Sequence, residues 1–475
     1  MTSATPDILL VAINARYSHC AYAARTLLAN LGPRQTTARI FETDLDITPV
    51  QLASLIVEAH PRIVGFSVYL WNVRLIEATA RILRAVAPHL RLAAGGPELT
   101  ADYANAALFD TVIIGEGETA FRAFCEQQEP TPATTSTVIL SPPENPATLE
   151  LPYPFYTDAD LAQRVVYVEA SRGCPFACAY CTSAGTGLRL IPLERLLPAF
   201  DALWQRGLRR FKFLDRSFNA PAAQACALLD FFLCRVTPDT RLHFELNAGH
   251  MHESVATRIS AFPKDTLHLE VGIQTLNPQV AALAGRSTDT QRTLENLRFL
   301  TRETGATVHA DLIFGLPGED EASFAQGFNT LLTQTAPPEV QVNLLKGLPG
   351  TRFARDAVKL GLAFNPEPPY ELLHSDVMDF KTLSRLQCFS RCWELIYNRK
   401  RFPHTVRSLH AACGNDLYTV YLTLAKRIQA AEGKLFAISL PRLARNLQAH
   451  LTEQCGIVET EARRLIAADL NAKPM

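Results

Sequence analysis

Three cysteines stand close together near the middle of the chain. Cys174, Cys178 and Cys181 lie in the stretch SRGCPFACAYCTSAG, residues 171–185, with the spacing CxxxCxxC. Thiolates at this spacing on one loop can converge on a metal centre, and three of them leave one iron of a 4Fe-4S cube without a protein ligand. A catalytic centre keeps such an open position for a substrate or cosubstrate, whereas a structural site closes it.

Other interpretations of the cysteines stay open. The three thiols could belong to a structural zinc site completed by a distant residue, or be unrelated, although no second CxxC or HxxxH follows nearby. The eleven cysteines, an odd number without paired spacing, do not form a disulfide framework. Two further pairs, Cys226 with Cys234 and Cys388 with Cys392, are predicted to pack in helix cores and not to hold a second cluster.

Composition limits the classes of partner. The chain has 475 residues, enough for two or three domains, and its 46 Lys and Arg against 47 Asp and Glu give a net charge of -1. Nucleic acid is therefore not favoured as a partner. The N-terminal run before Asn14 is short and lacks a basic flank, so it predicts a first strand and not a signal peptide. No apolar window reaches the roughly 18 residues of a membrane span, and we expect no membrane partner and a cytoplasmic protein.

The pattern of apolar runs divides the chain into four parts. Residues 1–126 alternate five short strands (ILLVAI, TARIFE, RIVGFSV, LRLAAGG and TVIIGEGE) with helices, which predicts a doubly wound, Rossmann-like α/β domain. Residues 127–160, rich in Pro, Thr and Ser, are predicted to be a linker. Residues 161–350 contain six further strands alternating with helices, which predicts a partial (β/α)6 barrel. Residues 351–475 have helical periodicity and predict a mainly helical region.

In both predicted sheets, we expect the functional residues at the carboxyl ends of the strands, where the loops gather. The cysteine loop follows the first strand of the barrel region. In the first sheet, the corresponding loops read NARYSH, SVYLWN, GGPE and GEGE. The candidate residues therefore gather on loops that parallel sheets place at one edge.

The motif CPFACAYC resembles the signature of radical S-adenosylmethionine enzymes, including the aromatic Tyr180 before the third cysteine. The resemblance implies that Cys174, Cys178 and Cys181 hold a 4Fe-4S cluster whose open iron is chelated by S-adenosylmethionine. Reductive cleavage would then yield a 5'-deoxyadenosyl radical. The resemblance also implies an external electron donor of the flavodoxin or ferredoxin type.

Further barrel segments resemble those that contact S-adenosylmethionine in this superfamily. KFLDRSFN ends the second strand, although the glycine pair and glutamate usual there are absent; HFELNAG, EVGIQTLNP and HADLIFGLPGE form the third, fourth and fifth strands. Glu245 and Glu270 lie inside apolar strands, where a carboxylate without a partner is costly, so a functional role is favoured over a packing role. Asp215 and Arg216 could equally form a strand-end ion pair. The S-adenosylmethionine candidates are Tyr180, Asp215, Arg216, Glu245, Gln274 and Gly315.

The order of the two α/β regions resembles the cobalamin-binding class of the superfamily. IVGFSVYLWN, AAGGPELT and IIGEGETAF are similar to its loop segments. Glycines there would let the backbone approach a flat macrocycle, and Ser67 offers a hydroxyl at a strand end, although tight turns in any parallel sheet would also explain the glycines. The cobalamin candidates are Asn14, Ser67, Tyr69, Leu70, Gly95, Gly96, Gly115, Glu116 and Gly117.

The lower axial ligand of cobalt is not predicted from the sequence. Many cobalamin domains carry DxHxxG after the first strand, but the loop NARYSHCAY places His19 out of that register. The resemblance therefore implies binding without a histidine ligand. Tyr69, Leu70 or Trp71 could instead cap the lower face.

Nearly the whole chain resembles cobalamin-dependent radical S-adenosylmethionine proteins that share a C-terminal extension of undefined role. This similarity implies a methyltransferase acting at an unactivated carbon of a small-molecule or peptide substrate. Alternatives are a rearrangement, cyclisation or redox reaction that uses cobalamin without methyl transfer, and a non-catalytic cofactor carrier. Methylthiotransfer to transfer RNA is a weaker alternative, because it would usually need a second cluster and an RNA-binding module. We expect the C-terminal region to close the mouth of the barrel.

Overall fold

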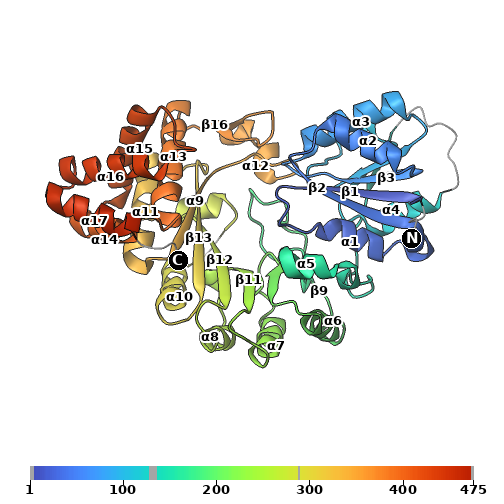
Figure 1. Cartoon of the computed structure of the whole chain (residues 1–475), viewed down its shortest axis with the longest axis horizontal. Coiled ribbons are helices and arrows are strands. Elements are labelled where there is room, and N and C mark those ends of the chain that lie inside the picture. Colours follow the sequence, from blue (N-terminus) through green and yellow to red (C-terminus); the bar gives the residue numbers. More distant parts are fainter. Residues whose placement is uncertain (1–4, 128–135, 287–288, 472–475) are drawn as a thin grey trace.

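The computed structural model describes residues 5–127, 136–286 and 289–471. Three parts lie side by side: an α/β domain at the N-terminal end, a curved sheet with its helices in the centre, and a helical region at the C-terminal end (Figure 1). No helix in these residues is long and apolar enough to cross a membrane.

The first sheet is six-stranded and parallel, with the order β2-β1-β3-β4-β5-β6. Apolar strands alternate with helices along the chain, and the helices cover both faces of the sheet. One apolar core forms beneath α2 and α3, and the other forms beneath α1 and α4. The elements are β1 (Ile8–Asn14), α1 (Tyr22–Ala29), β2 (Ala38–Asp44), α2 (Pro49–Glu58), β3 (Ile63–Ser67), α3 (Val73–Val86), β4 (Arg91–Gly95), β5 (Thr111–Ile114), α4 (Glu118–Glu126) and β6 (Thr137–Leu140).

The sixth strand, β6, lies within the segment predicted as a linker. It pairs in parallel with β5, from Thr111 opposite Thr137 to Ile114 opposite Leu140. Its four residues, TVIL, form a mostly exposed edge, and the Pro-, Thr- and Ser-rich sequence on both sides of this short run favoured the linker prediction. Residues 128–135 of the predicted linker lie outside the described residues.

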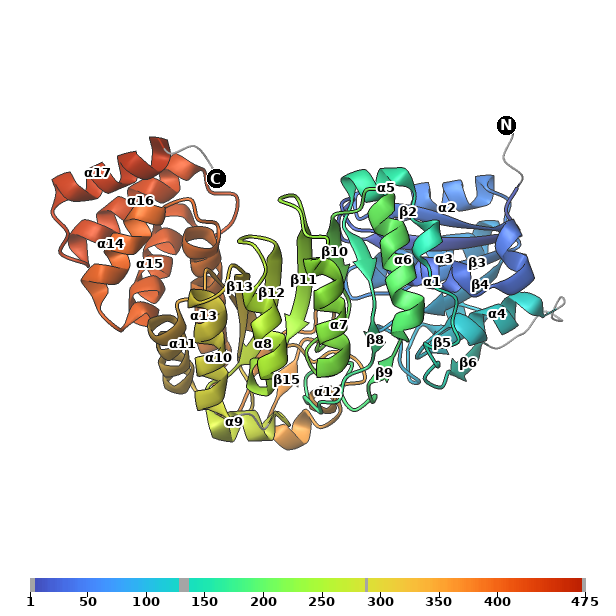
Figure 2. The same ribbon diagram turned by 90° about the horizontal axis from the view of Figure 1, so that it is seen from below.

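The second sheet is also six-stranded and parallel, in the chain order β7, β10, β11, β12, β13 and β14. It forms the predicted partial (β/α)6 barrel, with helices along its outer face (Figure 2). Its elements are β7 (Val166–Val168), α6 (Leu193–Gln205), β10 (Arg210–Phe213), α7 (Ala222–Leu233), β11 (Arg241–Leu246), α8 (Glu253–Ser260), β12 (Leu267–Gln274), α9 (Pro278–Leu283), α10 (Thr290–Arg302), β13 (Thr307–Phe314), α11 (Glu321–Thr335) and β14 (Glu339–Leu344).

The two faces of the barrel strands differ in polarity. Along β12 and β13, every second residue is buried and apolar, and the residues between them are half-buried and mostly polar. The apolar set packs against the outer helices, so the polar set lines the interior of the curved sheet. This interior is more polar than the branched aliphatic filling typical of closed parallel barrels.

The C-terminal helices cover the free edge of the barrel sheet. α13 (Phe380–Trp393) and the following π-helical turn (Glu394–Asn398) lie beside β14. Trp393 Nε1 and Asn398 Nδ2 donate to the Val340 carbonyl, at 2.8 Å and 2.9 Å, and Val340 N donates to Asn398 Oδ1 at 3.0 Å. Side chains thus satisfy the backbone groups that an edge strand would otherwise expose. The further helices are α14 (Pro403–Cys413), α15 (Leu417–Glu432), α16 (Leu440–Glu453) and α17 (Glu459–Asn471).

A short segment before these helices reaches the N-terminal domain. It contains β15 (Ala363–Phe364) and β16 (Leu372–His374). Arg74 pairs with Glu367 at 2.8 Å, and the Tyr370 hydroxyl donates to Glu98. This segment reaches toward the N-terminal domain, whereas the helical bundle covers the edge of the barrel sheet.

Candidate functional site

The cysteine loop is folded tightly between β7 and α6. Gly173 has φ +83°, and a Cβ there would lie 1.9 Å from the Gly187 carbonyl oxygen, so only glycine fits before the first cysteine. Within the loop, Cys181 N donates to the Cys178 carbonyl at 3.0 Å, and Cys174 N donates to a threonine hydroxyl at 3.3 Å. Two cysteines are buried and Cys181 is half-buried.

The arrangement of the three sulfurs fits a cluster better than a single metal ion. Three Zn–S bonds of 2.3 Å in a tetrahedron would place the sulfurs about 3.8 Å apart. Among the residues that the structure describes, Cys174, Cys178 and Cys181 do not form a set whose ligand atoms all lie within 4.8 Å of one another. Three protein thiolates spaced more widely suit the iron atoms of a 4Fe-4S cube.

A half-buried arginine stands next to the second cysteine. Arg286 Nη1 lies 3.9 Å from Cys178 Sγ, and its Nη2 donates to the Gly272 carbonyl. A guanidinium there stabilises thiolate charge. The sequence gave no local signal for it, because Arg286 and Cys178 are 108 positions apart.

The carboxylate of Asp215 is engaged in holding the backbone. It is buried and accepts hydrogen bonds from Ala170 N at 2.9 Å and from the Ser171 hydroxyl at 2.5 Å. Burial raises the pKa of Asp215 to about 7. Asp215 therefore fixes the strand end from which the cysteine loop leaves, and its contact with S-adenosylmethionine stays a prediction.

Arg216 and Glu245 form a pair across adjacent strand ends. Arg216 Nη1 lies 3.5 Å from Glu245 Oε1. Burial raises the pKa of Glu245, and Arg216 partly offsets this effect. Glu270 instead pairs with His243 Nε2 at 3.0 Å, and this hydrogen bond lowers the pKa of Glu270 to about 2. Each strand carboxylate therefore has a protein partner, as the cost of burial requires.

The remaining S-adenosylmethionine candidates differ in whether contacts within the protein already account for them. Gln274 has φ +69°, and its Oε1 is buried without a hydrogen-bond partner among the described residues, as expected of a group that awaits a ligand. The Tyr180 hydroxyl is likewise buried without such a partner. Gly315, in contrast, has φ +86°, and a Cβ there would lie 2.7 Å from Leu372 Cδ2, so packing explains this glycine.

The predicted cobalamin loops meet at one edge of the first sheet. Gly96 and Gly115 both have positive φ. A Cβ on Gly96 would lie 2.1 Å from Val68 O, and a Cβ on Gly115 would lie 2.6 Å from Ser141 O, so the fold requires both glycines. Gly95 is different, because a Cβ there would be no closer than 3.7 Å to any neighbour. The space beside Gly95 is thus available to a ligand.

The loop after β1 turns away from this space. Asn14 Nδ2 donates to the His19 carbonyl at 2.8 Å and to Glu42 at 3.1 Å. His19 Nδ1 lies 2.5 Å from the Tyr167 hydroxyl of β7, so its ring contacts the barrel. Neither residue lines the cavity described below, nor does Leu70. A cobalamin contact of Asn14 or Leu70 stays a prediction.

Tyr69 lies beside an exposed aromatic surface. Its ring stacks on Trp71, with centroids 4.5 Å apart and an interplanar angle of 4°. Trp71 is 45% exposed, and its Nε1 donates to the Ile13 carbonyl. The pair offers a flat apolar face next to Ser67.

A network of charged residues joins the two α/β domains beside the cysteine loop. Arg172, two positions before Cys174, pairs with Glu118 at 2.7 Å and with Glu116 at 3.3 Å, both from the first domain. Arg189 also pairs with Glu116, at 2.5 Å. Arg189 opposes Arg172 on the short strand pair that brackets the cysteine loop. The carboxylate of Glu116 therefore binds arginines; a contact with cobalamin stays a prediction.

One cavity of about 630 Å³ lies between these elements. Thr182 and Ser183, which follow the third cysteine directly, line it together with residues of the first domain. It therefore connects the cysteine loop with the loops after β3, β4 and β5. The sequence-predicted residues that line it are Ser67, Tyr69, Gly95, Gly96, Gly115, Glu116, Gly117 and Arg216.

Two expectations about the other cysteines have different outcomes. Cys392 is fully buried, as predicted. Cys234 is exposed at the end of α7, so its assignment to the core was wrong. The first position after a helix faces solvent as readily as the core, which helical spacing alone does not distinguish.

Family comparisons divide the chain in the same order. Residues 9–125 match the B12 binding domain, residues 168–331 match the radical SAM superfamily, and residues 358–470 match a protein family of unknown function (DUF4080). The predicted cofactors, a 4Fe-4S cluster with S-adenosylmethionine and cobalamin, are those of the first two families.

Two curated relatives are named methyltransferases. The chain is 26% identical over 423 residues to the 2-(S-pantetheinyl)-carbapenam-3-carboxylate methyltransferase of Streptantibioticus cattleyicolor, covering 77% of this chain and 59% of that protein. It is 23% identical over 300 residues to an uncharacterized methyltransferase of Pyrococcus horikoshii, covering 58% of this chain and 64% of that protein. The match thus spans less than two thirds of each relative.

Two solved structures share the fold. The radical S-adenosylmethionine methyltransferase TsrM from Kitasatospora setae, with tryptophan and a SAM analog bound, superposes with a TM-score of 0.60 at 17% identity, over 78% of this chain and 80% of that chain. The cobalamin-dependent radical enzyme OxsB, with aqua-cobalamin and S-adenosylmethionine bound, gives a TM-score of 0.60 at 14% identity, over 98% and 81%. The chain thus contains a B12 binding domain followed by a radical SAM domain, and it ends in a region that matches a family of unknown function.

Proposed function

We propose that the protein is a cobalamin-dependent radical S-adenosylmethionine methyltransferase that acts at an unactivated carbon of a small-molecule or peptide substrate. The shared cavity carries this proposal, because residues after Cys181 and glycine loops of the B12-binding domain line the same space. When bound, the cluster with S-adenosylmethionine supplies a 5'-deoxyadenosyl radical, and cobalamin supplies a transferable methyl group.

The chain's own residues have three tasks in this scheme. Cys174, Cys178 and Cys181 hold the cluster, with the Arg286 guanidinium beside Cys178 compensating thiolate charge. The glycine loops after β4 and β5 admit the corrinoid. The cavity walls from both domains hold reacting groups close together and exclude water, which is the main contribution of protein to such cofactor chemistry.

Gln274 and Arg216 are the residues best placed to orient S-adenosylmethionine. Gln274 Oε1 is a buried acceptor, available to an amino or hydroxyl donor. Arg216 lines the cavity and is half exposed, so its guanidinium can reach a carboxylate while it stays close to Glu245. A one-electron donor of the flavodoxin or ferredoxin type completes the requirements.

The test is anaerobic turnover of the reconstituted full chain. With cluster, cobalamin, reductant and S-adenosylmethionine present, a methyltransferase forms both 5'-deoxyadenosine and S-adenosylhomocysteine. Each single alanine variant of the three cysteines should lose 5'-deoxyadenosine, and omission of cobalamin should abolish S-adenosylhomocysteine. Formation of 5'-deoxyadenosine alone would instead indicate rearrangement, cyclisation or redox chemistry. Neither product from cluster-loaded protein, with candidate substrates present, would favour a carrier.

A further inference from the structure

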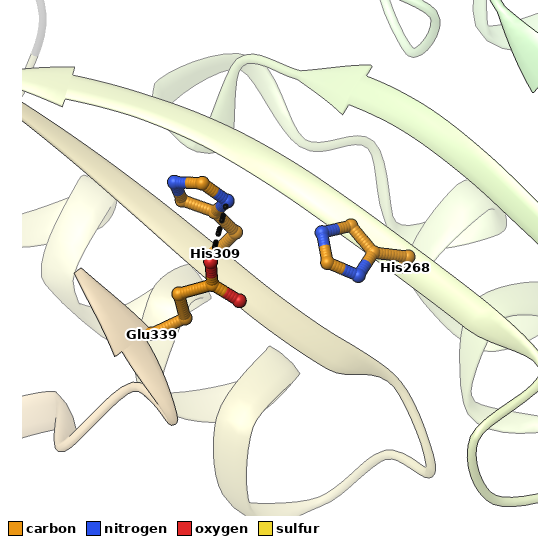
Figure 3. A group of neighbouring side chains, drawn as sticks. All are labelled: His268, His309 and Glu339. Carbon is orange, nitrogen blue, oxygen red and sulfur yellow. Dashed lines mark ion pairs between the residues drawn. The ribbon is translucent and has the colours of Figure 1, made fainter. Parts of the chain in front are cut away.

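A cluster of imidazole and carboxylate groups lies inside the barrel, away from the cysteine loop. His268 is near the start of β12, His309 near the start of β13, and Glu339 begins β14 (Figure 3). The cysteine loop follows the other, carboxyl end of a strand. At about 3.3 Å per residue, His268 lies roughly 20 Å along its strand from Gln274.

Strand register brings the three side chains together. His309 stands directly opposite Glu339 across β13 and β14, and His268 stands opposite Thr307, two positions before His309. Because side chains alternate between faces, all three belong to the polar set that lines the barrel interior. One ligand atom from each of the three lies within 4.8 Å of the other two.

The distance between His309 and Glu339 suits two ligands of one metal ion as well as an ion pair. His309 Nδ1 lies 3.6 Å from Glu339 Oε1, too far for a hydrogen bond but suitable for two ligands of one ion (Figure 3). Metal–ligand bonds of 2.0–2.2 Å at tetrahedral angles separate ligand atoms by about 3.4 Å. A ligand atom of His268 lies within 4.8 Å of a ligand atom of each of the other two residues.

Groups around the three residues resemble the outer shell of a metal site. His309 Nε2 lies 3.3 Å from Asp311 Oδ1, close enough for an ion pair, although this nitrogen makes no hydrogen bond within the described residues. A carboxylate at the second nitrogen of a metal-bound histidine fixes its tautomer and orientation. His268 stacks on His243 with centroids 4.6 Å apart, and its imidazole makes no hydrogen bond within the described part of the chain.

The site has a route for entry. A second cavity, of about 580 Å³, is lined by His309 and Glu339 on one side and by Glu394 and Phe436 of the C-terminal region on the other. An ion can therefore reach the ligands without passing the cysteine loop. The three ligands lie on neighbouring strands at the N-terminal end of the barrel, the end at which residues usually contribute to stability. A bound ion would therefore hold the three strands together.

We infer that His268, His309 and Glu339 form a binding site for one divalent transition-metal ion, separate from the cluster. Two imidazoles and one carboxylate are a ligand set typical of Zn²⁺ or Fe²⁺, with the remaining positions filled by water. This inference does not depend on the proposed function.

Zinc binding to the full chain tests it. The protein is reconstituted with its cluster, so that Cys174, Cys178 and Cys181 are occupied, and is then freed of loose metal and titrated with Zn²⁺ against a competing chelator. At the same free zinc concentration, we expect wild type to bind one more Zn²⁺ ion per chain than His268→Ala or Glu339→Gln. If the variants still bind that ion, we expect wild type to bind it at least about 10-fold more tightly. Gln341→Ala, two positions along the same strand face, serves as the control and should bind as wild type.

Thermal unfolding supplies the second measurement. Zn²⁺ should raise the Tm of wild type and Gln341→Ala, and should leave that of Glu339→Gln unchanged. Glu339→Gln keeps the shape of the side chain, so it decides the question if His268→Ala fails to fold. Equal zinc binding and equal Tm shifts in wild type and Glu339→Gln would overturn the site, because the metal would then be bound elsewhere, for example by the other cysteines.

Discussion

Gly95 and Gly96, at the end of β4, are adjacent but have different roles. The fold requires Gly96, whereas Gly95 is expected to leave space for cobalamin. Gly96 has φ +138°, and its missing Cβ would lie 2.1 Å from Val68 O. Gly95 has no such conflict, because its nearest neighbour would be Ile113 O at 3.7 Å, yet it lines the shared cavity. We therefore predict opposite effects when each is replaced by alanine.

The expected magnitudes follow from these contacts. Gly95→Ala should leave Tm unchanged or raise it, since a tolerated Gly-to-Ala change stabilises by about 0.4–1 kcal/mol. If corrinoid packs against this backbone, the added methyl group costs about 1–3 kcal/mol of binding, or about 5- to 150-fold in Kd. Gly96→Ala should cost about 2 kcal/mol of stability or more through backbone strain, which lowers Tm by about 4–8 °C.

The assay is titration of each variant with hydroxocobalamin, followed by absorption, alongside thermal unfolding without ligand. Each variant is the control of the other, because they differ by one position in the same loop. Wild-type affinity in Gly95→Ala would refute the assignment of this cavity to cobalamin. An undiminished Tm in Gly96→Ala would refute the steric argument.

Three further changes test the surrounding contacts. Arg172→Gln leaves the buried carboxylate of Glu118 without its arginine partner and should cost about 3–5 kcal/mol, measured as a loss of Tm and of bound cobalamin. Burial raises the pKa of Asp215 to about 7, so between about pH 4 and pH 7 the folded chain keeps a proton that the unfolded chain releases. The contribution of this group to stability is therefore present below about pH 4 and is lost as the pH rises to about 7. Asp215→Asn should flatten that decline in Tm. Gly315→Ala should lower Tm, because its Cβ would meet Leu372, with no separate loss of S-adenosylmethionine affinity from a direct contact.

Local sequence patterns predicted the elements that depend on local physics. Apolar patterns marked all strands of the barrel and five strands of the first sheet. Strands β1 and β3 are buried at every position and read as continuous apolar runs, whereas β12 and β13 alternate buried apolar residues with half-buried ones. The CxxxCxxC spacing predicted the cluster loop, since the three ligands are close in sequence. The edge strand β6 was missed although it reads TVIL, because the Pro-, Thr- and Ser-rich residues on both sides of this short run are typical of a linker.

Contacts between distant residues could not be predicted in this way. The carboxylate of Asp215 accepts hydrogen bonds from Ala170 and Ser171, 45 and 44 positions earlier, which no local pattern indicated. Arg286 reaches Cys178 across 108 positions. Such pairs arise from the order of strands in a sheet, which composition and periodicity do not specify.

The contacts between the domains explain why the cavity depends on the whole chain. Methyl transfer by the proposed route requires the radical source and the methyl carrier to share one space, because both act on the same substrate carbon. Neither sheet encloses that space alone, since its walls come from both. Arg172 fixes one side through Glu116 and Glu118, next to the cluster loop, while Tyr370 of the C-terminal segment fixes another through Glu98. The region of unknown function therefore contributes to the distance between the two cofactor sites, and a change in that segment should alter methyl transfer even where each site still binds its own cofactor.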